Sequence, residues 1–150
     1  MKIRPALSSD VPKIVEFQIA MAKETEDMNL DEKTVKRGVM AVLNDKQKAR
    51  YFVAVENKVL CGCFMVTPGW SDWRAAYFIW LQSVYVLPEH RKQGVFRMMY
   101  DYMKEIVEKN DDYRGMRLYV EKANQRAINA YLNVGMEDAG YQMLEWDKEK

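Results

Sequence analysis

Hydrophobic and polar positions change their spacing several times along the chain, and each change marks an expected element. Ile3 to Ala6 reads as a first strand. Apolar residues at helical spacing then predict a helix that contains Pro12 in its first turn and continues to about Ala22. The same spacing predicts a second helix from Asp31 or Glu32 to Leu43. The chain is therefore expected to begin with a strand and two helices.

The middle of the chain has the short apolar runs that are typical of strands. The segments YFVAV and VLCGCFMV flank Glu56-Asn57-Lys58, which predicts a β-hairpin. Gly69 to Arg74 is rich in turn residues and is expected to interrupt the sheet. Tyr77 to Val86 follows as a long strand with aromatic and β-branched residues.

Helices and strands alternate in the second half. The pattern predicts a helix from Gly94 or Val95 to about Lys109, a strand at Met116–Glu121, a helix from Asn124 to about Val134, and a closing strand near Tyr141–Trp146. The order β-α-α-β-β-β-α-β-α-β favours an α/β (α+β) fold, with a mixed sheet and at least one right-handed strand–helix–strand crossover. No repeat or linker divides the sequence, so residues 1–150 are expected to form one domain.

Composition and charge exclude some classes of partner. The 150 residues are 49% hydrophobic and 30% charged, with 23 Lys and Arg against 22 Asp and Glu. This balance argues against nucleic acid or an anionic membrane as the main partner. The first residues lack the apolar core of a secretory signal, and no apolar run reaches membrane-spanning length, so we expect a cytoplasmic protein.

Two cysteines lie on one predicted strand. Cys61 and Cys63 point to the same face, where a disulfide between them would be strained. A metal site would need more ligands, and the only histidine is His90. We therefore expect reduced, packed thiols and no metal.

A basic turn joins the strand that ends near Leu87 to the following helix. Pro88 stops the strand, and Gly94 removes a side chain where the backbone must bend or approach a ligand. Arg91 and Lys92 stand just before the helix, whose first turn offers unpaired N–H groups and a positive dipole end. This arrangement suits a pyrophosphate. An ordinary turn with solvated charges remains an equal alternative.

Two motifs give the chain a family resemblance. Arg91–Phe96, RKQGVF, resembles the Q/R-x-x-G-x-G/A acyl-CoA loop of the GNAT N-acetyltransferases and follows VYVLPEH, which is similar to the family's strand ending. Downstream, the family pattern N-x-x-A-x-x-x-Y-x-x-x-G-F/M is matched by Asn124, Ala127, Tyr131, Gly135 and Met136. The resemblance implies a GNAT-like mixed, mostly antiparallel sheet flanked by about four helices.

One position departs from the motif. Phe96 stands where the family has Gly or Ala, and its ring could crowd a diphosphate. It could instead turn into the core, because the helix carries an apolar stripe of Phe96, Met99, Tyr100, Met103 and Val107. We favour the second alternative, since the backbone N–H groups survive the substitution.

The resemblance implies transfer of an acetyl group from acetyl-CoA to an amine by direct attack. The backbone of Val84, Tyr85 and Val86 would pair with the pantetheine arm. The pyrophosphate would be held by amides of Arg91, Lys92, Gln93, Gly94, Val95, Phe96 and Arg97. Asn124 would bind the CoA arm or fix the start of its helix. Tyr131 would act as the general acid toward the leaving thiolate.

The general base and the acceptor site are less defined by the motifs. Many relatives carry a glutamate where this chain has Gln82-Ser83. Glu24 and Glu26, expected in the loop between the first two helices, are candidate bases, as are Glu121 and a relaying water; solvated loop carboxylates are the alternative. Trp73, Gln82 and Glu121 are candidate acceptor-binding residues.

The main hypothesis is thus an N-acetyltransferase for a small-molecule or peptide amine. The alternative is a non-catalytic acyl-CoA-binding module, which Phe96 and the missing strand glutamate keep open. A nucleic-acid-binding role is disfavoured by the near-neutral charge. Many relatives form dimers, so a homodimer also stays open.

Overall fold

The computed structural model describes all residues from Met1 to Lys150 and divides into two units. The first unit contains a five-stranded sheet. The first unit is Met1–Tyr119 and the second is Val120–Lys150. The strands are β1 (Lys2–Pro5), β2 (Arg50–Glu56), β3 (Val59–Ser71), β4 (Ala76–Val86) and β5 (Tyr113–Leu118). The α-helices of the first unit are α1 (Val11–Glu26), α2 (Glu32–Asn44) and α3 (Val95–Lys109), and the second unit contains α4 (Gln125–Asn133). The expectation of one domain stays a prediction.

The strands lie in the sheet in their chain order, β1-β2-β3-β4-β5. Neighbours from β1 to β4 are antiparallel, and β5 pairs with β4 in parallel. Parallel neighbours cannot be joined by a tight turn, and α3 makes the connection between them. The expected mixed, mostly antiparallel α/β fold is confirmed.

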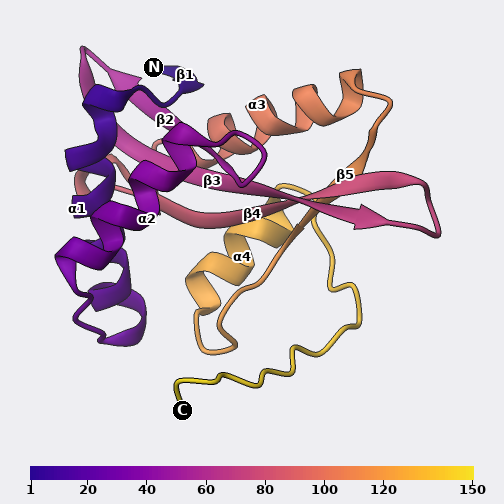
Figure 1. The fold of residues 1–150 in the computed structure, drawn as a ribbon. Helices are drawn as coiled ribbons and strands as arrows, with labels where there is room; N and C mark the ends of the chain where they lie inside the picture. The colour runs from indigo at the N-terminus through magenta and orange to yellow at the C-terminus, as the bar shows by residue number, and fades with distance from the viewer. The chain divides into compact units, whose positions relative to one another are not determined.

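The sheet is covered on both faces because successive side chains along a strand point to opposite sides. Phe52 of β2 stacks on Phe64 of β3 at 5.1 Å and meets Tyr102 of α3 at 5.5 Å. On the other face, Phe17 of α1 packs against Tyr85 of β4 at 5.4 Å. Figure 1 shows α1 and α2 on one side of the sheet and α3 on the other. Burial of a ring such as Phe17 or Phe52 contributes about 2–3 kcal/mol.

A partly buried ion pair fixes the start of α1 against β1. Arg4 Nη1 lies 2.7 Å from Asp10 Oδ2, and the same carboxylate accepts the N–H of Leu7 at 2.7 Å. Burial alone would raise the pKa of Asp10, but the bonds from Arg4 and Leu7 outweigh it and leave the pKa below its ordinary value. The carboxylate is therefore stabilised in its charged form.

Three elements differ from the sequence prediction by three or more residues at an end. One is β5, which spans Tyr113–Leu118 where the pattern predicts Met116–Glu121. α1 continues past Ala22 to Glu26, so Glu24 and Glu26 lie in its last turn and not in a loop. The Lys23–Asp27 pair, 2.6 Å apart at helical spacing, supports this extra turn. β3 likewise continues through Gly69 to Ser71, because Trp70 packs edge-on against Tyr77 of β4 at 4.9 Å and extends the hairpin.

No strand follows α4, although the pattern predicts one near 141–146. The segment is bounded by two turns that use local side-chain bonds: Asp138 accepts the N–H of Gly140, and Asp147 accepts the N–H of Glu149. Its large side chains are exposed, Trp146 to 87%. Alternating apolar residues alone do not make a strand, because the backbone also needs a hydrogen-bonding partner.

Candidate functional site

β4 contains one extra residue opposite β3, near its carboxyl end. Cys63 pairs with Tyr85 and Met65 pairs with Gln82, so Ser83 and Val84 together oppose Phe64. Ser83 takes a left-handed backbone conformation, with φ of 53°. The thiol of Cys63 donates to the Ser83 carbonyl at 3.7 Å. The sequence pattern does not predict this bulge, because serine carries no signal for positive φ.

Beyond the bulge, one edge of β4 is open. The pairing with β5 ends at Leu81 and Leu118, while β4 continues to Val86. Leu87 N–H donates to Cys61 O at 2.9 Å. Because the backbone groups of successive residues in a strand point to opposite edges, those of Val86 point away from β3. Such an edge can accept an extended ligand as an added strand.

The open edge leads into the basic turn at the start of α3. A short 3-10 turn, Pro88–His90, stops the strand where the sequence predicts. Lys92 and Gly94 then take positive φ of 63° and 80°. Gly94 is the N-cap residue of α3, and no side chain caps the helix there. A Cβ at Gly94 would meet nothing within 4 Å, so the space beside this residue is open.

This turn has the donor set that a diphosphate requires. Left-handed residues such as Lys92 and Gly94 directly before a helix can turn successive main-chain N–H groups toward an anion. Lys92 is exposed, and Gln93 is held to the Glu89 carbonyl at 3.1 Å. The residues present therefore fit the pyrophosphate of an acyl-CoA.

The Phe96 ring packs along α3. Its centroid lies 6.2 Å from that of Tyr100, one turn further on the helix. Phe96 is half-buried and Val95 beside it is buried. That the Phe96 ring leaves the main-chain donors accessible to a diphosphate stays a prediction.

Three side chains meet where α1, β4 and the basic turn come together. Arg91 Nη2 lies 2.9 Å from Glu24 Oε2, and the Tyr85 hydroxyl donates to Glu24 Oε1 at 3.4 Å. The Arg91 guanidinium also lies over the Tyr85 ring, 5.5 Å from its centroid. Burial and the nearby Glu24 carboxylate raise the pKa of Tyr85. Sequence gave no sign of this cluster, since Glu24 and Arg91 are 67 positions apart.

The second unit holds the other motif. Asn124 is the N-cap residue of α4 and accepts the N–H of Ala127 at 3.2 Å, which is the helix-starting role considered for it. Tyr131 lies two helical turns further along α4 and so on the same face. Burial raises the pKa of Tyr131, which keeps the phenol protonated near neutral pH. Glu121 accepts the N–H of Ala123 at 2.6 Å in the preceding turn.

Comparison with known proteins decides the family. The sequence model of the Acetyltransferase (GNAT) family matches residues 16–136. The chain belongs to the GNAT acetyltransferase family. A possible acetyltransferase from Clostridium difficile 630 has the same fold, with a TM-score of 0.92 and 40% identity over 97% of this chain and 96% of that chain.

More distant GNAT-like structures share the fold alone. An aminoglycoside 6'-N-acetyltransferase from Acinetobacter haemolyticus has a TM-score of 0.76 at 14% identity, over 99% of this chain and 98% of that one. A predicted acetyltransferase from Clostridium acetobutylicum, with acetyl-CoA, has a TM-score of 0.75 at 17% identity, over 97% and 95%. No curated protein matches the sequence.

The remaining predicted residues of this GNAT protein lie apart from the cluster. The Gln82 amide donates to Thr67 Oγ1 at 3.1 Å across β3 and β4. Trp73 is 86% exposed at the tip of the β3–β4 hairpin. The strand between that tip and the bulge is roughly 25 Å long at about 3.3 Å per residue. Glu26 is exposed on the last turn of α1. Acceptor binding by Trp73 and Gln82 stays a prediction.

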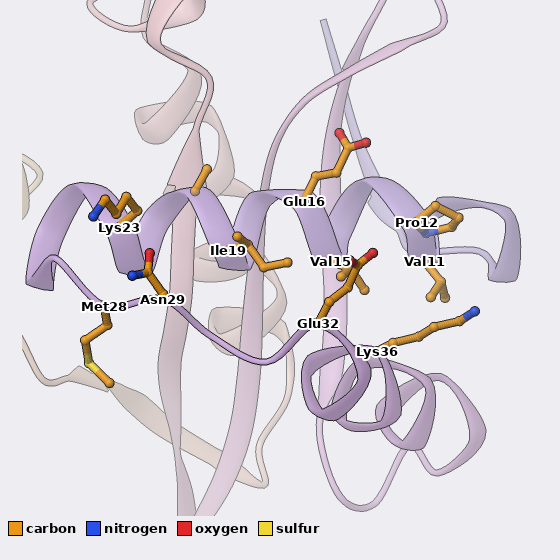
Figure 2. Close-up of a pocket in the computed structure, with 11 residues that line it drawn as sticks. Val11, Pro12, Val15, Glu16, Ile19, Lys23, Met28, Asn29, Glu32 and Lys36 are labelled. Atoms are coloured by element: carbon orange, nitrogen blue, oxygen red, sulfur yellow. The ribbon is translucent and has the colours of Figure 1, made fainter.

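A separate groove of about 630 Å³ lies between α1 and α2. Figure 2 shows Val15 and Ile19 of α1 directed toward it, with Glu32 and Lys36 of α2 on the other side. None of the predicted site residues lines this groove.

No cluster of three or more metal-ligating side chains is present. None of the helices is long and apolar enough to cross a membrane.

Proposed function

We propose that the protein is an acetyl-CoA-dependent N-acetyltransferase that acts on a primary amine of a small molecule or peptide. The observation that carries this proposal is the continuity of two binding elements. The unpaired edge of β4 from Gln82 to Val86 leads directly to the uncapped amino end of α3. One element suits an extended amide-containing arm and the other suits a diphosphate, and coenzyme A joins both in one molecule.

The main chain supplies most of the cofactor contacts in this proposal. Backbone alternation directs the groups of Val84 and Val86 to the open edge, whereas those of Tyr85 face Cys63. Val84 and Val86 would therefore pair with the arm, whereas the backbone of Tyr85 would not. The Arg91 N–H already donates to the Pro88 carbonyl at 3.2 Å, so the N–H groups from Lys92 to Arg97 would hold the diphosphate, with Lys92 adding charge. When bound, acetyl-CoA supplies the activated thioester.

Tyr131 is proposed as the proton donor to the leaving thiolate. Its raised pKa keeps the phenol protonated across the neutral range, as a general acid requires. Asn124 caps the helix that carries Tyr131 and so holds its backbone. Tyr131 would thus act on the cofactor's sulfur and not on the acceptor.

Glu24 is proposed as the group that receives the proton of the attacking amine. Its carboxylate lies at the end of β4, beside the proposed cofactor arm, where Tyr85 and Arg91 orient it. Glu26 lies two residues further in the exposed last turn, and Glu121 is used in a local turn, so each is a weaker candidate. A carboxylate in this place also favours a cationic acceptor. An aminoglycoside acetyltransferase of the same fold is compatible with this class.

A non-catalytic acyl-CoA-binding module is the second candidate, favoured by Phe96 and by Gln82 in place of a strand glutamate. Both functions predict that acetyl-CoA raises the melting temperature. Only the enzyme releases free thiol from acetyl-CoA when it is offered polyamines, aminoglycosides, amino acids and peptides. Stabilisation without thiol release from any amine would favour the binding module. Neither effect would reject both.

A further inference from the structure

Arg91 occupies part of the edge that the proposed cofactor arm would use. Its Nε donates to the Val86 carbonyl at 2.9 Å, while Nη2 pairs with Glu24 at 2.9 Å. The side chain thus lies back along β4 and not over the amino end of α3. The Arg91 and Glu24 side chains are 25% and 35% exposed, so the pair is partly shielded from water.

The cofactor arm and the Arg91 guanidinium would compete for the Val86 carbonyl. An arm that adds to β4 as a strand needs the backbone acceptor of Val86, which the guanidinium holds. A diphosphate at the start of α3 would offer the same guanidinium a doubly charged partner. We propose that Arg91 is a latch, held on Val86 by Glu24, that must leave this carbonyl when the cofactor enters. The inference rests on the proposed function.

Release of the latch would also change Glu24. While Arg91 is in contact with Glu24, the guanidinium neutralises the carboxylate. When Arg91 leaves, the carboxylate keeps its contact with the Tyr85 hydroxyl. A cationic amine would then meet an available carboxylate. Cofactor and amine would therefore favour each other's binding, because a coupling between two sites acts equally in both directions. Glu24 would be a positioning residue for Arg91 before the cofactor binds.

Calorimetric titration of coenzyme A into four proteins tests the latch without any turnover. These are the wild type, Glu24→Gln, Arg91→Ala and the double variant, with Glu26→Gln as a control for loss of a nearby negative charge. Glu24→Gln should tighten coenzyme A by about two- to fivefold, the range expected for release of a partly exposed ion pair. In the Arg91→Ala background, the same change should have less than about a 1.5-fold effect. Glu26→Gln should match the wild type.

The double variant separates the latch from simple charge repulsion. If Glu24 only repelled the phosphates, its neutralisation would tighten binding equally, or more, when Arg91 is absent. Equal tightening in both backgrounds, or no tightening or a loss in the presence of Arg91, would overturn the latch while leaving coenzyme A binding intact. A wild type that does not bind coenzyme A would instead overturn the proposed function, and the latch with it. Arg91→Gln is a second variant if Arg91→Ala does not fold.

Discussion

The thiol of Cys63 donates to the carbonyl of Ser83 at the bulge where β4 has one residue more than β3. The amide of Gln18 in turn donates to the same sulfur at 3.6 Å. Two successive hydrogen bonds, from Gln18 of α1 to Cys63 of β3 and from Cys63 to Ser83, thus support the left-handed residue in β4. The bulge lies directly before the edge that we assign to the cofactor, so its shape sets where that edge begins.

Substitutions at Ser83 should follow its backbone conformation. A left-handed residue costs about 1–2 kcal/mol unless it is glycine, and glycine costs about 0.5–1 kcal/mol in chain entropy. Ser83→Gly should therefore be neutral or more stable by about 0.5 kcal/mol, and Ser83→Val should lose about 1–2 kcal/mol. Urea unfolding of both variants measures the difference. Equal stabilities would show that the bulge is not strained.

The two cysteines should be inert in the folded protein. Burial raises the pKa of the Cys63 thiol to about 12, although the hydrogen bond from Gln18 lowers it by a smaller amount. Burial also raises the pKa of the Cys61 thiol. Because the thiolate is the reactive form, Ellman's reagent should detect almost no thiol at pH 7.5 in the native protein and both thiols in urea. Rapid native labelling of either residue would contradict the packing described for β3.

Tyr131→Phe tests the proposed general acid. Removal of the hydroxyl should lower kcat at least about tenfold, equivalent to about 1.4 kcal/mol, because the leaving thiolate loses its proton donor. The Kd of acetyl-CoA should change little. Since burial raises the Tyr131 pKa above its ordinary value of 10.0, wild-type turnover should show no loss from Tyr131 ionisation between pH 7 and 9. Unchanged kcat in the variant would remove Tyr131 from the mechanism.

Glu24 and Glu26 form a matched pair for the general base. Both lie in the last turn of α1, but only Glu24 contacts Arg91 and Tyr85. At saturating acetyl-CoA, Glu24→Gln should lower kcat/KM for the amine at least about tenfold and remove the acidic limb of the rate profile. Glu26→Gln should keep both. If neither variant shifts that limb, the proton acceptor lies elsewhere, with Glu121 the next residue to test.

The Arg4–Asp10 pair should contribute stability that depends on pH. The folded-state pKa of Asp10 is lowered, so the contribution is present above the unfolded pKa of about 3.9 and is lost as pH falls through the folded value. Asp10→Asn should lower the free energy of unfolding by about 2 kcal/mol at pH 7. The deficit should shrink below about pH 4. A deficit that is constant down to pH 2 would contradict the charge-based account.

Local patterns were sufficient for most elements of the fold. The order of elements from the first strand to α4, and the turn at Pro88 before α3, follow from apolar spacing and from glycine and proline positions. The end of α1, the bulge at Ser83 and the absent strand at 141–146 could not be derived in this way. Each depends on contacts between distant segments or on a missing partner strand, which hydrophobic periodicity does not encode.

Some parts of the site can likewise be predicted from local sequence, and others depend on contacts between distant segments. Main-chain donors before α3 could be inferred because Gly94 and the start of a helix are local features. The Arg91 side chain could not be placed, since its partners Glu24 and Val86 come from other elements. Arginine in a phosphate-binding motif suggested a phosphate contact, whereas the structure shows it against a carboxylate.

A crystal structure with coenzyme A would show whether the turn before α3 and the edge of β4 bind the cofactor. Diphosphate oxygens should lie within about 2.7–3.2 Å of main-chain N–H groups between Gly94 and Arg97. The pantetheine arm should be hydrogen-bonded to the edge of β4 at Val84 and Val86. Coenzyme A bound elsewhere, or a turn left empty because the Phe96 ring fills it, would contradict the account.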